Sequence, residues 1–332
     1  MGLVKILYLY NFNINIVTPY KSTVRKPLFK LYYSMRSYFC FNRILAGVIA
    51  LLLLATLFYA CGKTTNDVAP SNNNDNQSIG AAFNQAAASG IYNDLFSVAA
   101  EISASSGSIL DEAGRTAGKD KPVAKLGGCY QSGIDDVTFD HWPKRDTIYF
   151  GAGCPDESGR SRSGTLIMTF SGYFRYAGST VTIEPVGYAV NGVSVTGKTI
   201  ITNLSNNDVY KYSVKVQGGS IKPDTVVIGY ASNFTFTQTA GAGTTGAEGL
   251  KDDVYAVTGS DTVTYPGNIV AITNIADSSA LIRKFDCPYI GKGKATLTLK
   301  SVSASIDYGN GVCDDSALIS IGDKVKYIGL PK

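Results

Sequence analysis

Four cysteines are the residues whose type and spacing most clearly indicate chemistry in this sequence. Cys129 and Cys154 are 25 residues apart, and Cys287 and Cys313 are 26 residues apart. Four cysteines allow three disulfide pairings, and a four-cysteine zinc site and unpaired buried thiols are the alternatives. No C-x₂₋₄-C knuckle occurs, and an export-type leader precedes the cysteines. We therefore expect disulfides and assign no metal site.

A short phrase around these cysteines occurs twice. Residues 149–156 (YFGAGCPD) are similar to residues 307–314 (DYGNGVCD) when one inserted residue is allowed, and each copy follows a strand-like run. The match indicates an ancient duplication or two equivalent strand–turn–strand units. It favours the pairs Cys129–Cys154 and Cys287–Cys313. Each pair would close a loop that stabilises the fold by about 3–3.5 kcal/mol in the chain-entropy model.

The sequence offers few groups for catalysis. His141 is the single histidine, so a Ser-His-Asp or Cys-His site would have to use it, and no G-x-S-x-G elbow occurs. Acidic pairs occur at residues 135–136, 156–157, 252–253 and 314–315. Turn chemistry explains Asp beside Gly, while calcium binding and glycoside hydrolysis are the alternatives. We assign no catalytic residue and no cofactor, and we favour a protein that is not an enzyme.

Two further motifs have simpler structural explanations. Residues 241–246 (GAGTTG) match the dinucleotide fingerprint, but an alternating strand-like run precedes them and no helix-like run follows, which predicts a long hairpin loop. Trp142 and the 21 tyrosines could line a sugar-binding face. Tyrosines at this density more often fill half-buried strand positions. Trp142 is therefore a ligand-binding candidate on its residue type alone.

The first 61 residues predict export and lipid attachment. Residues 44–60 are an uninterrupted apolar run that Arg43 precedes and Cys61 follows, which is the layout of a signal peptide. Residues 57–61 (LFYAC) resemble the lipobox of bacterial lipoproteins, which implies a lipid on Cys61 that inserts into the bilayer. An uncleaved membrane anchor and an ordinary signal peptide are the alternatives, because Phe58 and Tyr59 depart from the lipobox pattern. Translation from Met35 would make residues 35–60 the signal peptide and residues 1–34 a start-site artefact.

Charge excludes one class of function. Residues 1–60 carry seven Lys or Arg and no Asp or Glu, which leaves 23 basic against 26 acidic residues downstream. Nucleic-acid binding needs a basic stripe on the folded domain, and no basic run occurs there.

The rest of the chain predicts a mainly β fold. Residues 61–77 are polar and predict a flexible tether. Residues 78–115 form a short helical segment with apolar residues at spacings of three and four, covering the sheet, with Gly90 marking a kink or a break. Residues 120–332 form an antiparallel meander, folded as a sandwich or an open barrel. Predicted strands include residues 147–150, 165–170, 181–184, 199–202, 210–216, 225–230, 233–237, 269–272 and 295–299. Predicted turns are at residues 191–192, 259–260 and 266–268.

Two long phrases carry a family resemblance. Residues 148–183 (IYFGAGCPDESGRSRSGTLIMTFSGYFRYAGSTVTI) and residues 305–322 (SIDYGNGVCDDSALISIG) resemble a group of uncharacterised lipoproteins of Bacteroidota-type bacteria. The resemblance covers roughly residues 44–332 and implies localisation in the cell envelope without implying an activity. We expect anchoring in the outer membrane, on its periplasmic or its surface face. We expect an envelope lipoprotein whose β domain binds or scaffolds a glycan or an envelope protein. A carbohydrate-binding accessory protein is the alternative, and a hydrolase is the least favoured.

Overall fold

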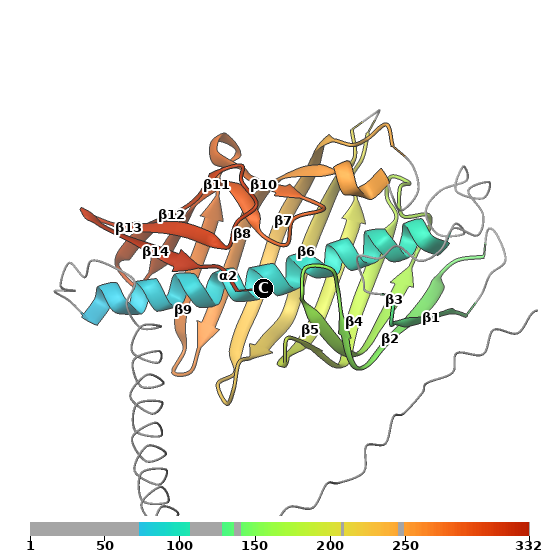
Figure 1. The fold of residues 1–332 in the computed structure, drawn as a ribbon, viewed down its shortest axis with the longest axis horizontal. Helices are drawn as coiled ribbons and strands as arrows, with labels where there is room; N and C mark the ends of the chain where they lie inside the picture. Colours follow the sequence, from blue (N-terminus) through green and yellow to red (C-terminus); the bar gives the residue numbers. More distant parts are fainter. Residues whose placement is uncertain (1–72, 107–127, 136–140, 207–208, 245–248, 332) are drawn as a thin grey trace, which may run out of the picture. The chain divides into compact units, whose positions relative to one another are not determined.

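The computed structural model describes residues 73–106, 128–135, 141–206, 209–244 and 249–331. The predicted signal peptide and Cys61 lie outside them. One long helix and 14 strands make up most of the fold (Figure 1). The first half comprises α2 (Asn73–Ser106), β1 (Gln131–Ile134), β2 (Lys144–Pro155), β3 (Ser161–Phe170), β4 (Thr180–Val190), β5 (Val193–Asn203), β6 (Lys211–Lys222) and β7 (Ile228–Ala240). The second half comprises η3 (Leu250–Asp252), β8 (Val254–Tyr265), β9 (Ile269–Ile275), η4 (Asp277–Ser279), β10 (Leu281–Lys284), β11 (Ile290–Leu299), β12 (Val302–Asn310), β13 (Ser316–Ile321) and β14 (Lys324–Gly329).

The strands form one antiparallel sheet. Its order follows the chain from β1 to β8 and continues through β10 to β14, while β9 pairs with both β8 and β11. The predicted antiparallel meander preceded by a helix is therefore confirmed. All described strands belong to a single sheet and not to two stacked ones.

The sheet curves around α2. Every residue from 91 to 103 is buried, and the helix contacts β4, β5, β6, β8 and all four strands from β11 to β14. Strands from both halves of the sheet therefore pack against this helix. Figure 1 shows α2 running across the strands, with β13 and β14 near it.

The helix differs from the prediction in four ways. It begins at Asn73, inside the predicted tether, and it continues through Gly90 without a break. Its second half has no solvent-facing side, because the curved sheet packs around it rather than along one stripe. Phe83, which the apolar spacing placed in the buried stripe, is 44% exposed. None of the helices in the described segments has the length and apolarity of a membrane span.

Two of the three predicted turns are confirmed. Asn191 and Gly192 join β4 to β5 with positive φ at both residues, as a type I′ hairpin requires, and residues 266–268 join β8 to β9. The turn predicted at residues 259–260 is wrong, because both residues lie inside β8. Gly259 is needed there for another reason: a Cβ atom at that position would lie 2.2 Å from the carbonyl oxygen of Asn233 on β7.

Glycines also allow the sheet to bend around the helix. Gly197 of β5 has a φ of 90°, and a Cβ there would lie 2.5 Å from the Cα of Gly219 on β6. The register between β5 and β6 shifts at this point, between Thr196 and Lys198. Such a bulge leaves carbonyl groups without ladder partners. The hydroxyl of Tyr92 on α2 donates to Thr196 O at 2.8 Å and lies 3.1 Å from Ser220 O, so the helix contacts both strands at the bend.

We expect Gly197→Ala to lower the free energy of unfolding by at least about 2 kcal/mol, because the new Cβ would combine a positive φ with backbone overlap. Gly133→Ala on β1 is the matched control, since Gly133 has open space around it and no positive φ. Urea unfolding of both variants measures the difference. Equal, small losses in the two variants would contradict the role of Gly197 in the bend.

Candidate functional site

The centre of the candidate site is the carboxylate of Asp94, which α2 carries into the fold. Arg162 of β3 binds it side-on: Nε lies 2.9 Å from Oδ2, and Nη2 lies 2.9 Å from Oδ1 and 2.8 Å from Oδ2. Arg160 donates through Nη1 to Oδ1 of the same carboxylate. Arg162 also donates through Nη1 to Oδ2 of Asp156 at 2.9 Å. All four side chains are buried, so their charges are compensated inside the protein.

The arginines keep Asp94 ionised. Burial alone would raise the pKa of Asp94, but Arg160 and Arg162 hold that pKa well below its ordinary range. Burial would lower the pKa of Arg162, and Asp94 raises it above the ordinary value. Asp94 is therefore a fixed negative charge near neutral pH and is unsuited to accept a proton as a general base.

Arg283 of β10 joins this cluster without a carboxylate of its own. Its side chain is buried, and its Nη2 donates to Oγ of Ser97 at 2.6 Å. No carboxylate in the described part of the chain lies within ion-pair distance of it. Burial lowers the pKa of Arg283 to about 10; Asp94 opposes this change and Arg160 adds to it. We call Asp94, Asp156, Arg160, Arg162 and Arg283 the ion cluster. It holds three guanidinium groups and two carboxylates.

A cavity of about 170 Å³ opens beside the ion cluster. Asp94, Asp156, Arg160 and Arg283 line its buried end, and the exposed side chains of Glu157, Lys251 and Asp286 lie at its mouth. The volume exceeds the roughly 10–15 Å³ that admits one water and is smaller than the roughly 300 Å³ of a drug-sized pocket. The cavity is therefore suited to a small molecule or to the head group of a larger one.

Both disulfides fix walls of this cavity. Cys129 pairs with Cys154, and Cys287 pairs with Cys313, with Cα–Cα distances of 5.6 and 5.9 Å. These are the pairings that the repeated phrase favours. Cys154 directly precedes the wall formed by residues 156–158, and Cys287 lies in the wall formed by residues 285–288. A hydrogen bond from Arg160 Nη2 to Pro288 O, 3.4 Å long, connects the two walls.

The repeated phrases end in the same local structure. Oδ1 of Asp156 accepts hydrogen bonds from the backbone N–H and the hydroxyl of Ser158, at 2.9 and 2.7 Å. Oδ1 of Asp314 accepts the same pair from Ser316, at 3.0 and 2.7 Å. The two turns differ in their surroundings, since Asp156 is buried against Arg162 and Asp314 is exposed. The first phrase alone contributes its carboxylate to the ion cluster.

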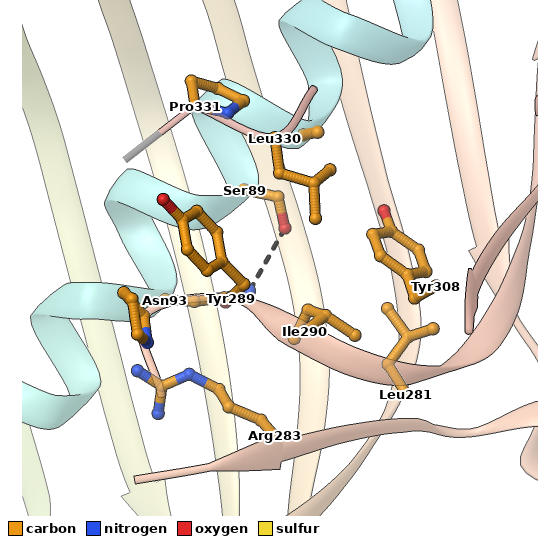
Figure 2. A pocket seen from close by; sticks show the side chains of 12 residues that line it. Ser89, Asn93, Leu281, Arg283, Tyr289, Ile290, Tyr308, Leu330 and Pro331 are labelled. Carbon is orange, nitrogen blue, oxygen red and sulfur yellow. Dashed lines mark hydrogen bonds between the residues drawn. The ribbon is translucent and has the colours of Figure 1, made fainter. Parts of the chain in front are cut away.

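Arg283 also borders a second, smaller cavity of about 40 Å³. Figure 2 shows its guanidinium extending from β10 toward Asn93 of α2, with Tyr289 nearby. Asn93 donates through Nδ2 to Oγ of Ser89 at 3.1 Å, which holds the amide of Asn93 on the helix surface. Arg283 therefore borders both spaces, and Asp94, Asp156 and Arg160 of the ion cluster also line the larger one.

The structure places most of the sequence candidates away from this cavity. His141 is exposed and does not line it. Trp142 is half-buried, with the edge of Tyr173 against its ring at a centroid distance of 5.0 Å. Gly241 follows β7 in the connection to β8, as a hairpin loop predicts, while Gly246 lies outside the described residues. Of the acidic pairs, Asp156 and Glu157 line the cavity. No group of three His, Cys, Asp or Glu side chains suited to a metal ion occurs within the described segments.

Two local features of the sequence indicate the ion cluster, although neither matches a known motif. Asp94 is flanked by Tyr92, Leu95 and Phe96, so an acid sits within an apolar helical run. Arg160 and Arg162 are two residues apart at the start of a strand and so share one face of it. A buried acid and an alternating pair of arginines need each other, because either alone would be an uncompensated buried charge.

Comparisons with protein-family models, with curated proteins and with solved structures find no match to this chain.

Asp94→Asn tests how far the fold depends on the cluster. The variant would leave three buried guanidinium groups against Asp156 alone, so we expect it to lower the free energy of unfolding by about 3–5 kcal/mol. Glu184→Gln is the control, because it removes an ion pair with Lys198 in which both side chains are nearly half exposed, worth no more than about 1 kcal/mol. Denaturant unfolding measures both. A loss in Asp94→Asn no larger than that in the control would contradict the assignment.

Asp261, a buried carboxylate outside the ion cluster, predicts that stability depends on pH. It differs from Asp94 because its hydrogen-bond partners carry no charge. Asp261 of β8 accepts a hydrogen bond from Nε2 of Gln85 on α2 at 2.6 Å and one from the hydroxyl of Tyr230 at 3.3 Å, and both partners are neutral. Burial raises the pKa of Asp261 to about 7, although Gln85 lowers it somewhat. The folded state therefore keeps a proton that the unfolded state releases near pH 4.

We expect the contribution of Asp261 to stability to be full below about pH 4 and to be lost as the pH rises to about 7, with a slope of at most about 1.4 kcal/mol per pH unit. In Asp261→Asn this component disappears. Urea unfolding across that pH range, compared with Asp323→Asn at an exposed position, measures it. Parallel stability curves for wild type and Asp261→Asn would show that Asp261 does not titrate in this range.

Proposed function

We propose that this chain is an exported cell-envelope protein, anchored in a bilayer through a lipid on Cys61, whose β domain binds a small ligand. The observation that carries the binding part is the cavity beside Asp94. Its buried end is charged, its mouth is exposed, and a disulfide is attached to each of two walls. Pre-formed walls favour binding because little order must be gained when the ligand enters.

Export is supported by two independent features. The leader of residues 35–60 has the layout of a signal peptide, and disulfides persist in oxidising compartments such as the bacterial periplasm. The lipobox-like residues 57–61 support lipid attachment and thus a position at the membrane surface rather than in free solution.

Binding is favoured over catalysis by the state of the groups in the cavity. Asp94 and Asp156 are ion-paired with arginines, and Cys287 is in a disulfide. Ser158 donates its hydroxyl to Asp156, and the single histidine does not line the cavity. Among the described residues, the buried end of the cavity therefore offers no nucleophile with an adjacent base, and the carboxylates of Glu157 and Asp286 are exposed at its mouth.

The intact mass of the protein from the membrane fraction of its native host tests the envelope assignment. We expect a mass that starts at Cys61 and includes a lipid, and that rises by about four protons on reduction of two disulfides. Cys61→Ala is the control and should lose the lipid and leave the membrane fraction. A wild-type mass that retains residues 44–60, or no change on reduction, would overturn the anchor or the compartment, respectively.

A further inference from the structure

We infer that the cavity beside the ion cluster binds an oxyanion, either a carboxylate or a phosphoryl group, through Arg283 and Arg160. The inference deepens the proposed binding function and rests on it. It assigns the ligand class by the charge at the buried end of the cavity.

The ion cluster holds one more guanidinium group than it holds carboxylates. Arg162 is matched by Asp94 and Asp156, and Arg160 shares Asp94 with it. Arg283 has only the neutral hydroxyl of Ser97 as a hydrogen-bond acceptor among the described residues. A buried guanidinium without a counter-ion is costly, and an anion placed beside it would remove that cost.

Two guanidinium N–H groups of the ion cluster lack a hydrogen-bond acceptor among the described residues. Nη1 of Arg283 and Nε of Arg160 are buried and have no acceptor in the described part of the chain. Both residues line the 170 Å³ cavity. Guanidinium groups bind carboxylate and phosphate oxygens with well-matched, charge-assisted hydrogen bonds. The chemistry of both donors therefore suits an anion, and a small movement of the two side chains toward the cavity would bring these buried nitrogens into contact with it.

The mouth of the cavity carries charges of both signs. Lys251 adds a positive charge at the mouth, while Glu157 and Asp286 add negative ones. An anionic group at the buried end, with a neutral or cationic remainder toward the mouth, matches this distribution. The acidic mouth disfavours ligands that carry several negative charges along their whole length.

Calorimetric titration of the mature folded domain with inorganic phosphate, and separately with acetate, tests the inference in a chloride-free buffer at fixed ionic strength. We expect saturable binding of at least one of the two anions, and the identity of that anion distinguishes a phosphoryl ligand from a carboxylate ligand. In Arg283→Met we expect the affinity to fall at least about 10-fold, which corresponds to the loss of one charge-assisted hydrogen bond. Arg145→Met at an exposed position of β2 is the matched control and should bind like wild type.

Thermal unfolding separates a ligand-binding role from a structural one. If Arg283 serves the ligand, Arg283→Met should unfold at the wild-type temperature or above it without anion, and the anion should raise the unfolding temperature of wild type alone. Should Arg283→Met not fold, Lys251→Met at the exposed mouth provides the second variant, with an expected affinity loss of about 2- to 5-fold. No saturable binding of phosphate or acetate, or equal affinity in wild type and Arg283→Met, would overturn the inference.

A panel of neutral glycans distinguishes failure of this inference from failure of the proposed function. Glycan binding without anion binding would overturn the oxyanion assignment and keep the binding function. No binding of either class would count against both.

Discussion

The fold depends on burying a charged helix inside a sheet. Asp94 lies on α2 where every neighbouring helix residue is buried, so its carboxylate is almost fully removed from solvent and needs partners from the sheet side. Arg162 of β3 and Arg160, just before this strand, provide the opposite charge. Gln85, Tyr92 and Ser97 of the same helix bind β8, the bend between β5 and β6, and β10. Apolar packing would tolerate a sliding or rotated helix, whereas these polar contacts are satisfied in one position only.

The enclosure of the helix sets the local structure of the sheet. Strands that wrap around a helix must bend sharply, and the bend occurs where bulges shift the register and glycines replace larger residues. Gly164 faces the backbone of Gly187 in the same way that Gly197 faces Gly219. The bend therefore requires glycines where the strands approach most closely. Between β5 and β6 it also places a backbone carbonyl, Thr196 O, where the hydroxyl of Tyr92 on the helix can bind it.

The sequence predicted what local patterns determine and missed what the enclosure determines. Alternating runs and Asn191-Gly192 identified antiparallel strands and a hairpin because both signals act over a few residues. The repeated phrase favoured the disulfide pairings that the structure contains. Gly259 was misread as a turn, because close approach of β7 is a tertiary constraint with the same residue preference. Arg283 was not singled out, since its partner Ser97 is 186 residues away.

The two repeated units explain why the cavity lies where it does. Each disulfide is attached to a turn or loop at the same region of the sheet, and the ion cluster occupies the space between them. In the first unit Asp156 turns inward and pairs with Arg162; in the second, Asp314 keeps the same turn but stays exposed. If the second unit had also contributed its carboxylate, the cluster would hold three anions and three cations. Because Asp314 stays outside, the cluster keeps three guanidinium groups against two carboxylates, and the proposed anion site rests on this imbalance.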